Sequence, residues 1–480
     1  MKAFRVLLAG CVLAFFGSGC AFIGLKQQIQ PMADAAALNG TLSNDAPQPA
    51  AYDSAQMSPM AVVVFKEEGG VKKIVRYKLM YKAGSFRFLL PPGTYSLAAF
   101  EDTNGDFVYQ AAENAGVLKE PARVVLGPAS SVSGLNLSIS HERPERLDVP
   151  VNLSSITPGA DATRQQLRIG KVLSLDDPRF DDASGEMGLW KYDRFRKEIG
   201  GGLFFLEPYD KDKIPVLFVH GYTGTPRDFK KMVERLDRKK YQPWFAFYPS
   251  AARIAIIAEH LNSAVIQLQM TYHFKELYVV GYSMGGLVSR SFILQNAEET
   301  HKGYIPLFIS IATPWNGHYM ADMRNLAPTE VPSWQDLATN SEFLLKIFSK
   351  PLPEGTKYYL FFGYEGDRNP LRKNNDRFIT IESALHPRAQ EEASGVYGFN
   401  VNHENILDLA EVSEKLAQIF EASEAGRANF IAEVGGDVTE AGKKIAGYPL
   451  PLINRLIIKP LSGIKRVFAQ APAQDKAARP

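Results

Sequence analysis

The chain has 480 residues, so at roughly 150 residues per domain we expect two or three folding units. Its composition, 45% hydrophobic and 22% charged, is typical of a globular protein. The 54 basic residues nearly balance the 52 acidic ones, and this even charge excludes the strongly basic type of nucleic-acid-binding protein.

The N-terminus has the layout of a secretory signal peptide over residues 1–19. Lys2 and Arg5 precede an apolar run over residues 6–16, and small residues follow that run. The run is shorter than the ~20 residues that cross a bilayer, so a permanent transmembrane helix is the weaker alternative. We therefore expect an exported protein.

The position of one cysteine indicates how the protein is held after export. The only two cysteines are Cys11, inside the apolar run, and Cys20, directly after the small residues, so the mature chain cannot contain an internal disulfide. The segment resembles the lipobox of bacterial lipoproteins, although Gly17 stands where that pattern usually has leucine. The resemblance implies lipidation of Cys20 and a membrane-anchored lipoprotein of the bacterial outer membrane or periplasm. The alternative is an ordinary signal with an incidental cysteine.

The next two segments predict a tether and a small β domain. Residues 20–59 are rich in Ala, Asn, Gln, Ser and Pro and have little periodicity, which favours a tether. Over residues 60–142, short runs of β-branched and aromatic residues alternate with turn residues, which predicts an all-β sandwich. Its stretch LPPGTYSLAAFEDTNGD resembles transthyretin-like and carboxypeptidase-regulatory-like domains. The sequence indicates no partner for this domain.

An acidic loop inside the predicted sandwich partly matches a calcium site. Asp102, Asn104, Asp106 and Glu113 fall at the first, third, fifth and twelfth places of a calcium-loop pattern. That pattern needs glycine at its sixth place, where this chain has Phe107. We expect a turn whose side chains bond their own backbone, with a calcium loop as the alternative.

The rest of the chain divides into a connector, an α/β region and a tail. Residues 143–200 are polar and predict a connector with a solvated, charged face. Over residues 201–425, buried-looking strands alternate with amphipathic stretches, which predicts parallel strands covered by helices on both faces. Residues 426–480 mix apolar and basic residues with Pro and Gly, so we expect a tail, loosely packed or lying on an anionic membrane.

The segment KELYVVGYSMGGLVSR carries the strongest chemical signal. An apolar strand runs into Gly281-Tyr282-Ser283-Met284-Gly285, and an apolar helix pattern follows. A G-x-S-x-G sequence between a strand and a helix is typical of a nucleophile elbow, whose glycines permit the strained turn at the serine. The pattern predicts Ser283 as a nucleophile, with the Met284 amide at a helix N-terminus to stabilise negative charge. The alternative is a glycine-rich turn without chemistry.

A second buried strand, IPVLFV, leads into His220, Gly221 and Tyr222 ahead of a helix. Both motifs resemble those of the α/β-hydrolase lipases and esterases, and the resemblance covers roughly residues 202–420. It implies an α/β-hydrolase fold preceded by the small sandwich, and a second oxyanion amide at Tyr222. Because His220 precedes the serine, the family order implies that it supports the loop. No metal or organic cofactor is needed for this chemistry.

A serine nucleophile needs a base, and the family order of the triad is serine, then acid, then histidine. His301 and His318 lie too early in the chain to be the base. His403, in FNVNHENILDL, is the predicted base, with His386 as the alternative.

The acid is expected after the predicted strand KYYLFFGY. The pattern NNDRFITIESAL resembles the acid segment of lipases and favours Asp376, whereas Asp367 and Glu365 are the alternatives. Residues 331–348 resemble a lipase lid, although a helix packed on the core by its apolar face explains the same spacing.

Together these residues predict a serine esterase or lipase. We expect cleavage of carboxylic esters in lipid-like, long-chain substrates through a triad of Ser283, His403 and Asp376. Acyl transfer at the same site, a peptidase or thioesterase, and an exported binding protein with a vestigial hydrolase fold are the alternatives.

Overall fold

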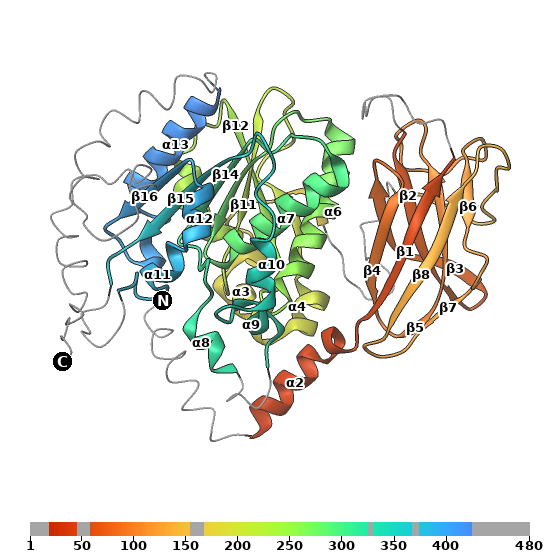
Figure 1. Ribbon diagram of the computed structural model, residues 1–480, viewed down its shortest axis with the longest axis horizontal. Helices are drawn as coiled ribbons and strands as arrows, with labels where there is room; N and C mark the ends of the chain where they lie inside the picture. The colour runs from red at the N-terminus through yellow and green to blue at the C-terminus, as the bar shows by residue number, and fades with distance from the viewer. Residues whose placement is uncertain (1–18, 46–57, 154–167, 325–329, 367–373, 425–480) are drawn as a thin grey trace, which may run out of the picture.

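The protein, seen in a computed structural model, has an N-terminal β-sandwich beside a larger α/β unit (Figure 1). The structure describes residues 19–45, 58–153, 168–324, 330–366 and 374–424. The predicted signal peptide, apart from Gly19, and the predicted tail over residues 426–480 lie outside these residues.

The sandwich consists of two sheets that share an apolar core. One sheet has the order β4-β1-β8, and the other has the order β3-β2-β5-β6, with β7 also paired to β5. The predicted strands within residues 60–142 are all present, and their alternating residues fill the space between the sheets. The strands are β1 (Ala36–Asn44), β2 (Met60–Glu68), β3 (Val71–Met80), β4 (Gly84–Leu90), β5 (Gly93–Glu101), β6 (Ala115–Val117), β7 (Val124–Leu126) and β8 (Ser131–Ile139).

The tether predicted for residues 20–59 is wrong over Ala36–Asn44, which is a central strand of the sandwich. This strand pairs with β4 on one side and β8 on the other. Leu38 and Leu42 point into the core and are almost completely buried. At Gly40 between them, a Cβ would lie 2.3 Å from the Phe86 ring, so glycine makes room for that ring. Most residues of this strand are small or polar, so the alternation of buried and exposed positions is not visible in its sequence. The other strands contain larger apolar residues, which make that alternation visible.

The α/β unit is built on an eight-stranded sheet with the order β16-β15-β14-β13-β11-β12-β10-β9. Its strands are parallel to their neighbours except at the β10–β12 pair, which is antiparallel. The strands are β9 (Arg168–Val172), β10 (Gly202–Phe205), β11 (Ile214–Val219), β12 (Tyr241–Phe247), β13 (Tyr278–Tyr282), β14 (Leu307–Ile311), β15 (Lys357–Gly363) and β16 (Gly395–Phe399).

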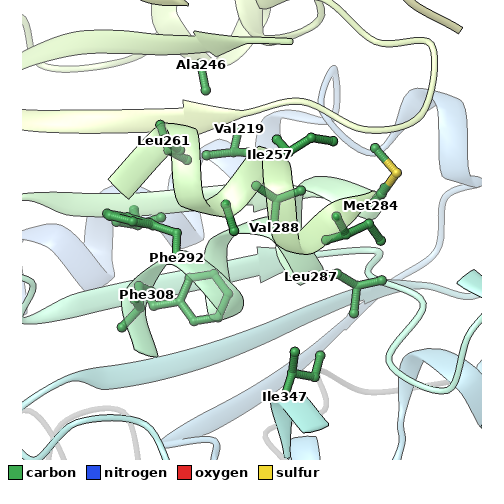
Figure 2. Packing of buried hydrophobic residues seen from close by; sticks show 14 of the residues in the cluster. Val219, Ala246, Ile257, Leu261, Met284, Leu287, Val288, Phe292, Phe308 and Ile347 are labelled. Atoms are coloured by element: carbon green, nitrogen blue, oxygen red, sulfur yellow. The ribbon is translucent and has the colours of Figure 1, made fainter. Parts of the chain in front are cut away.

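Helices cover both faces of this sheet, as the sequence predicts. The helices α6 (Ile254–Tyr272) and α7 (Met284–Thr300) pack on one face, together with Val219 and Phe308 of the sheet (Figure 2). The helices α5 (Lys230–Glu234) and α13 (Ala410–Glu424) cover the other face. Neighbouring residues of strand β13 face opposite sides of the sheet. Val279 packs with α6 and α7, whereas Val280 packs with α5 and α13, so the strand is apolar on both faces.

The connector predicted for residues 143–200 is wrong in its second half, which belongs to the α/β unit. Strand β9 pairs with β10, and the helices α3 (Asp182–Trp190) and α4 (Tyr192–Glu198) follow it. The charged face is as predicted at Asp176 and Asp182, which are exposed, and Asp181 in addition caps α3 by accepting a hydrogen bond from the Ser184 amide. Phe180 and Phe195 are fully buried, and they lie too far apart in the sequence to form a visible pattern.

Strand β3 of the sandwich lies against α6 of the α/β unit. Ile266 and Met270 of α6 are buried among sandwich residues. The Tyr77 hydroxyl donates to Gln267 Oε1 at 2.9 Å, and Lys78 pairs with Glu299 at 2.9 Å. The two units therefore share a mixed apolar and polar interface.

A helix at the start of the described chain, α2 (Gly19–Ala33), also contacts the α/β unit, which further corrects the predicted tether. Leu25 and Met32 pack against its core, and the Arg194 amide donates to Gln28 Oε1 at 3.1 Å. Among the described residues, no helix combines the length and apolarity needed to span a bilayer.

Candidate active site

Ser283 occupies the turn between β13 and α7 at the carboxyl edge of the parallel strands. Its backbone lies at φ 52° and ψ −127°, a conformation that a residue with a side chain adopts at a cost of about 1–3 kcal/mol. At Gly285, a Cβ would lie 2.1 Å from the Val219 carbonyl oxygen, and at Gly281 it would lie 2.7 Å from the Gly285 oxygen. The two glycines are therefore required for the strand and helix to meet at this turn.

Three side chains that the sequence analysis selected meet at this turn. Ser283 Oγ lies 3.0 Å from His403 Nε2, and His403 Nδ1 lies 2.7 Å from Asp376 Oδ2. All three are buried. Because the carboxylate can only accept, Nδ1 carries the proton, which leaves Nε2 free to accept from the serine hydroxyl.

The loops after β15 and β16 bring Asp376 and His403 to the serine. The Asp376 carboxylate accepts the amides of Phe378 at 3.0 Å and Ile379 at 2.6 Å through its Oδ1. The His403 amide donates to the Asp376 carbonyl at 2.8 Å, so backbone and side chains link the two loops. These bonds fix the carboxylate facing the imidazole.

The loop after β11 passes directly beside the serine. A Cβ on Gly221 would lie 2.7 Å from Ser283 Cβ, so this close approach requires glycine. The next residue is Tyr222, and Met284 is the first residue of α7. Both predicted oxyanion donors are thus on backbone adjoining Ser283, and the Met284 amide precedes the internal hydrogen bonds of its helix.

His220 supports this loop, and both of its ring nitrogens bond to backbone groups. Its Nδ1 donates to the Gly221 carbonyl at 2.8 Å, and its Nε2 accepts the Tyr248 amide at 3.3 Å. Its ring stacks on Tyr248 at 4.0 Å. Burial lowers the pKa of His220 to about 4, so the ring is neutral at pH 7.

The alternative candidates lie elsewhere in the structure. His386 precedes α12 (Pro387–Glu392) and stacks on Phe348. Glu365 is ion-paired with Arg377, and both side chains are exposed. Asp367 lies outside the described residues.

Two residues that the sequence analysis did not select adjoin the site. The Tyr282 hydroxyl donates to the His403 carbonyl at 2.9 Å, and a tyrosine next to the serine in the motif was the only signal for it. His318, which lies too early in the chain to be the base, donates through Nε2 to the Phe378 carbonyl at 2.9 Å. The Phe378 ring lies between the rings of His318 and His403.

The segment predicted as a lid is packed on the core. It forms α9 (Pro332–Leu337) and α10 (Glu342–Ile347). Leu337, Phe343, Leu344 and Ile347 are buried in the core cluster that includes α7, whereas Leu345 is exposed. Trp334 of α9 donates through Nε1 to the Tyr222 hydroxyl at 2.6 Å. The core-helix alternative therefore describes this segment.

The acidic loop of the sandwich bonds its own backbone. Asp102 accepts the amides of Gly105 at 2.9 Å and Phe107 at 3.0 Å. Asp106 accepts the Val108 amide at 2.7 Å, and Glu113 accepts the Thr103 amide at 2.7 Å. The prediction of an acidic turn is confirmed by these bonds.

Part of the α/β unit matches a known protein family. A family model described as alpha/beta hydrolase of unknown function (DUF915) matches residues 245–385. A search of curated proteins gives no match.

Several solved structures resemble the chain over less than half of its length. The lin2722 gene product of Listeria innocua is 18% identical, has a TM-score of 0.35, and covers 44% of this chain and 94% of its own. The mature lipase BlEst2 of Bacillus licheniformis is 20% identical, has a TM-score of 0.36, and covers 46% of this chain and 97% of its own. Phospholipase PlaB of Legionella pneumophila is 13% identical, has a TM-score of 0.30, and covers 36% of this chain and 45% of its own.

Three features together identify the fold: the sheet order, the serine turn after a central strand and the family match. Helices cover both sheet faces, and an all-β region precedes the sheet. The chain therefore has an α/β-hydrolase fold, and its residues 245–385 are similar to a family of alpha/beta hydrolases of unknown function.

Proposed function

We propose that the protein is a serine hydrolase that cleaves carboxylic ester bonds in lipid-like substrates. The observation that carries the proposal is the buried chain of contacts from Ser283 Oγ to His403 Nε2, 3.0 Å, and from His403 Nδ1 to Asp376 Oδ2, 2.7 Å. A vestigial hydrolase fold has no reason to keep a strained serine, an imidazole and a buried carboxylate at these hydrogen-bonding distances.

The mechanism begins with proton transfer from Ser283 to His403 Nε2 as the serine oxygen attacks the acyl carbon. The carbonyl oxygen becomes negative and receives hydrogen bonds from the amides of Tyr222 and Met284. Preorganised donors of this kind each stabilise the transition state by about 3–4 kcal/mol. Asp376 orients the imidazole and stabilises its positive charge.

The second half of the reaction releases the acyl group. His403 gives its proton to the leaving alcohol, and an acyl ester remains on Ser283. Water then loses a proton to His403 and attacks the acyl carbon. As the bond from that carbon to Ser283 Oγ breaks, His403 returns the proton to Oγ, which yields a carboxylic acid and the free serine. If an alcohol takes the place of water, the same residues perform acyl transfer.

The proposed lipid substrate follows from the proposed membrane anchor at Cys20. That cysteine is the second residue of α2, and Leu25 and Met32 of the same helix pack on the α/β unit. A docked helix, unlike a long tether, holds a lipidated N-terminus close to the catalytic unit. Esters within the anchoring membrane are then the nearest substrates.

Labelling with a fluorophosphonate probe tests the nucleophile. The wild-type protein should be labelled at a single serine, and Ser283→Ala should abolish labelling. Ser291→Ala, a substitution on the helix that follows Ser283, serves as the matched control and should be labelled like the wild type. Absence of labelling in folded wild-type protein would contradict the proposal.

Substrate profiling separates the possible reactions of an active serine. Nitrophenyl esters of increasing chain length, phospholipids, thioesters and peptides are compared, and free acid is measured against transferred ester in the presence of an acceptor alcohol. Long-chain ester hydrolysis is expected to be fastest.

In cells, Cys20→Ala should move the protein out of the membrane fraction, whereas an unchanged distribution would contradict the anchor.

A further inference from the structure

Tyr222 offers a free backbone amide beside the proposed nucleophile. Its neighbour Gly221 comes so close that a Cβ there would lie 3.3 Å from Ser283 Oγ. Within the part of the chain that the structure describes, no group accepts a hydrogen bond from the Tyr222 amide. A free amide at this place is suited to an oxyanion that forms only during the reaction.

The carbonyl side of Tyr222 is fixed by the next residue. Thr223 Oγ1 donates to the Tyr222 carbonyl at 2.7 Å, and the Thr223 amide donates to Ser250 Oγ at 3.2 Å. Thr223 has a φ of 56°, a left-handed conformation that a β-branched residue rarely adopts. A Cβ on Gly185 of α3 would lie 2.1 Å from the Thr223 carbonyl oxygen, so α3 packs directly against this turn. The turn is thus held in a strained conformation by its surroundings.

The side chain of Tyr222 is held from a different segment of the chain. Trp334 of α9 donates through Nε1 to the Tyr222 hydroxyl at 2.6 Å. On its other side, the Trp334 ring meets Trp190 of α3 edge to face, with ring centres 6.4 Å apart and planes at 81°. The neighbouring positions of α3 and α9 can be followed in Figure 1. This contact limits the rotation of the indole, so its N–H stays directed at Tyr222.

Helix α9 is anchored to the same loop that holds Thr223. The Ser333 amide donates to the Ala251 carbonyl at 3.0 Å, and Ala251 follows Ser250, whose Oγ accepts the Thr223 amide. The contacts therefore close a ring, which runs from Tyr222 through α9 and the loop after β12 back to Thr223. A shift of α9 is transmitted by this ring to the peptide that carries the oxyanion amide.

We propose that Trp334 is a positioning residue for the oxyanion amide of Tyr222. Its indole N–H holds the hydroxyl end of the tyrosine while Thr223 holds the carbonyl end, so the amide stays directed at the acyl oxygen of the substrate. The inference rests on the proposed serine hydrolase function. Without the indole N–H, the amide samples other orientations and stabilises the transition state less, whereas binding of the ground state changes little.

Two substitutions remove the two ends of this hydrogen bond. Trp334→Phe deletes the N–H and keeps an aromatic ring, and Tyr222→Phe deletes the hydroxyl that accepts it. Each should lower kcat for a nitrophenyl ester by about tenfold, part of the roughly 10²–10³-fold that a whole oxyanion donor supplies, and change KM by less than about twofold. Gln335→Ala, an exposed change on the same helix, is the control and should leave kcat unchanged. Thermal melting checks that each variant folds.

The double variant distinguishes one shared contact from two separate roles. Because both substitutions remove the same hydrogen bond, Trp334→Phe combined with Tyr222→Phe should have the kcat of either single variant. Effects that multiply to about a hundredfold loss would overturn the proposal. A raised KM with unchanged kcat would also overturn it, because Trp334 would then contact the substrate and have no effect on the amide.

A tetrahedral analogue gives a readout that a loss of stability alone does not change. When an alkyl trifluoromethyl ketone binds, a bond forms from Ser283 Oγ to its carbonyl carbon, the serine proton passes to His403, and the ketone oxygen becomes the oxyanion. The inhibition constant of this ketone should rise in Trp334→Phe by the factor by which kcat falls. The alcohol of the same chain forms no oxyanion, so its inhibition constant should not change. Equal weakening of both inhibitors would contradict the positioning role.

The outcomes keep this inference apart from the proposed function. A folded wild-type protein that neither reacts with a fluorophosphonate nor hydrolyses esters contradicts the proposed function, and the role of Trp334 with it. An active wild type whose folded Trp334→Phe and Tyr222→Phe variants keep its kcat contradicts the role of Trp334 alone.

Discussion

The Asp376 carboxylate is held by backbone amides of its own loop and contacts the imidazole of His403. One carboxylate oxygen accepts two amides of its own loop, and the other faces His403 Nδ1. The amides hold the carboxylate in place, and the carboxylate holds the imidazole in the tautomer that accepts the serine proton. In the proposed mechanism, Asp376 orients the imidazole and stabilises its positive charge.

Asp376→Asn should lower kcat for a nitrophenyl ester by about 10⁴-fold, because the amide favours the wrong imidazole tautomer. The protein should remain folded, since the asparagine oxygen can still accept the loop amides. Glu365→Gln is the control, because this exposed carboxylate contacts Arg377 and is expected to leave kcat unchanged. Loss of activity in both variants would instead indicate damage to the loop.

His318 gives a second test at the scale of one residue. Its Nδ1 accepts the Met320 amide at 3.2 Å while Nε2 donates to the Phe378 carbonyl, so both nitrogens of the neutral ring are hydrogen-bonded. Burial lowers the pKa of His318 to about 4. The unfolded chain takes up this proton at pH 6.5, so the associated stability is present above pH 6.5 and is lost as the pH falls toward 4.

His318→Gln should therefore flatten the acid side of the stability curve. Between pH 6 and 5, the free energy of unfolding of the wild type should fall more steeply than that of the variant, by about 1.4 kcal/mol per pH unit at most. Urea denaturation at several pH values measures this slope. Other shifted groups, such as His220, act equally in both proteins, so identical slopes would exclude the buried neutral state of His318.

At the scale of elements, the helices α9 and α10 are tied into the structure by a buried carboxylate. Asp336, which is completely buried, accepts the Ile254 amide at 2.6 Å and Arg253 Nε at 2.8 Å. It thereby caps the N-terminus of α6 from a different segment of the chain. This connection explains why the segment that resembles a lid lies on the core.

Asp336→Ala should lower the free energy of unfolding by about 2 kcal/mol, because a cap and a charge-assisted hydrogen bond are lost together. Urea denaturation measures the effect. Gln335→Ala is the control on the same helix, because Gln335 contacts Arg253 from an exposed position and should change stability by less than about 0.5 kcal/mol. Equal effects of the two substitutions would contradict a capping role.

At the scale of the whole molecule, the sandwich and the α/β unit stabilise each other across α6. Ile266 and Met270 of α6 are buried in a cluster whose other members are sandwich residues together with Val151 and Leu153. The polar contacts around them, including Tyr77 to Gln267, set the register of the two units. We expect the units to unfold in one calorimetric transition.

Ile266→Ala should lower the free energy of unfolding by about 2–4 kcal/mol and separate the single transition into two. The reason is a cavity placed at the interface, which weakens the coupling of the units more than either unit alone. Thr271→Ala, an exposed change on the same helix, should leave one transition. A single transition in Ile266→Ala would show that the units are not coupled through this residue.

The sequence by itself determined the features that depend on neighbouring residues. The strand, glycine, serine and helix around Ser283 were predictable because glycine sterics and the strand and helix periods act over a few positions. Most sandwich strands were predictable for the same reason. Strand β1 and the helices α3 and α4 were not, because their buried residues are small or widely spaced, and partners distant in the sequence decide their conformation.

Only the tertiary structure decided which residues meet. Ser283 and His403 are 120 positions apart, and His403 and Asp376 are 27 apart, so the order of strands at one sheet edge brings them together. The family order favoured this histidine and acid, but their distances follow from the sheet. The packing of α9 and α10 and the place of His318 likewise depend on contacts between distant segments, which local sequence patterns do not encode.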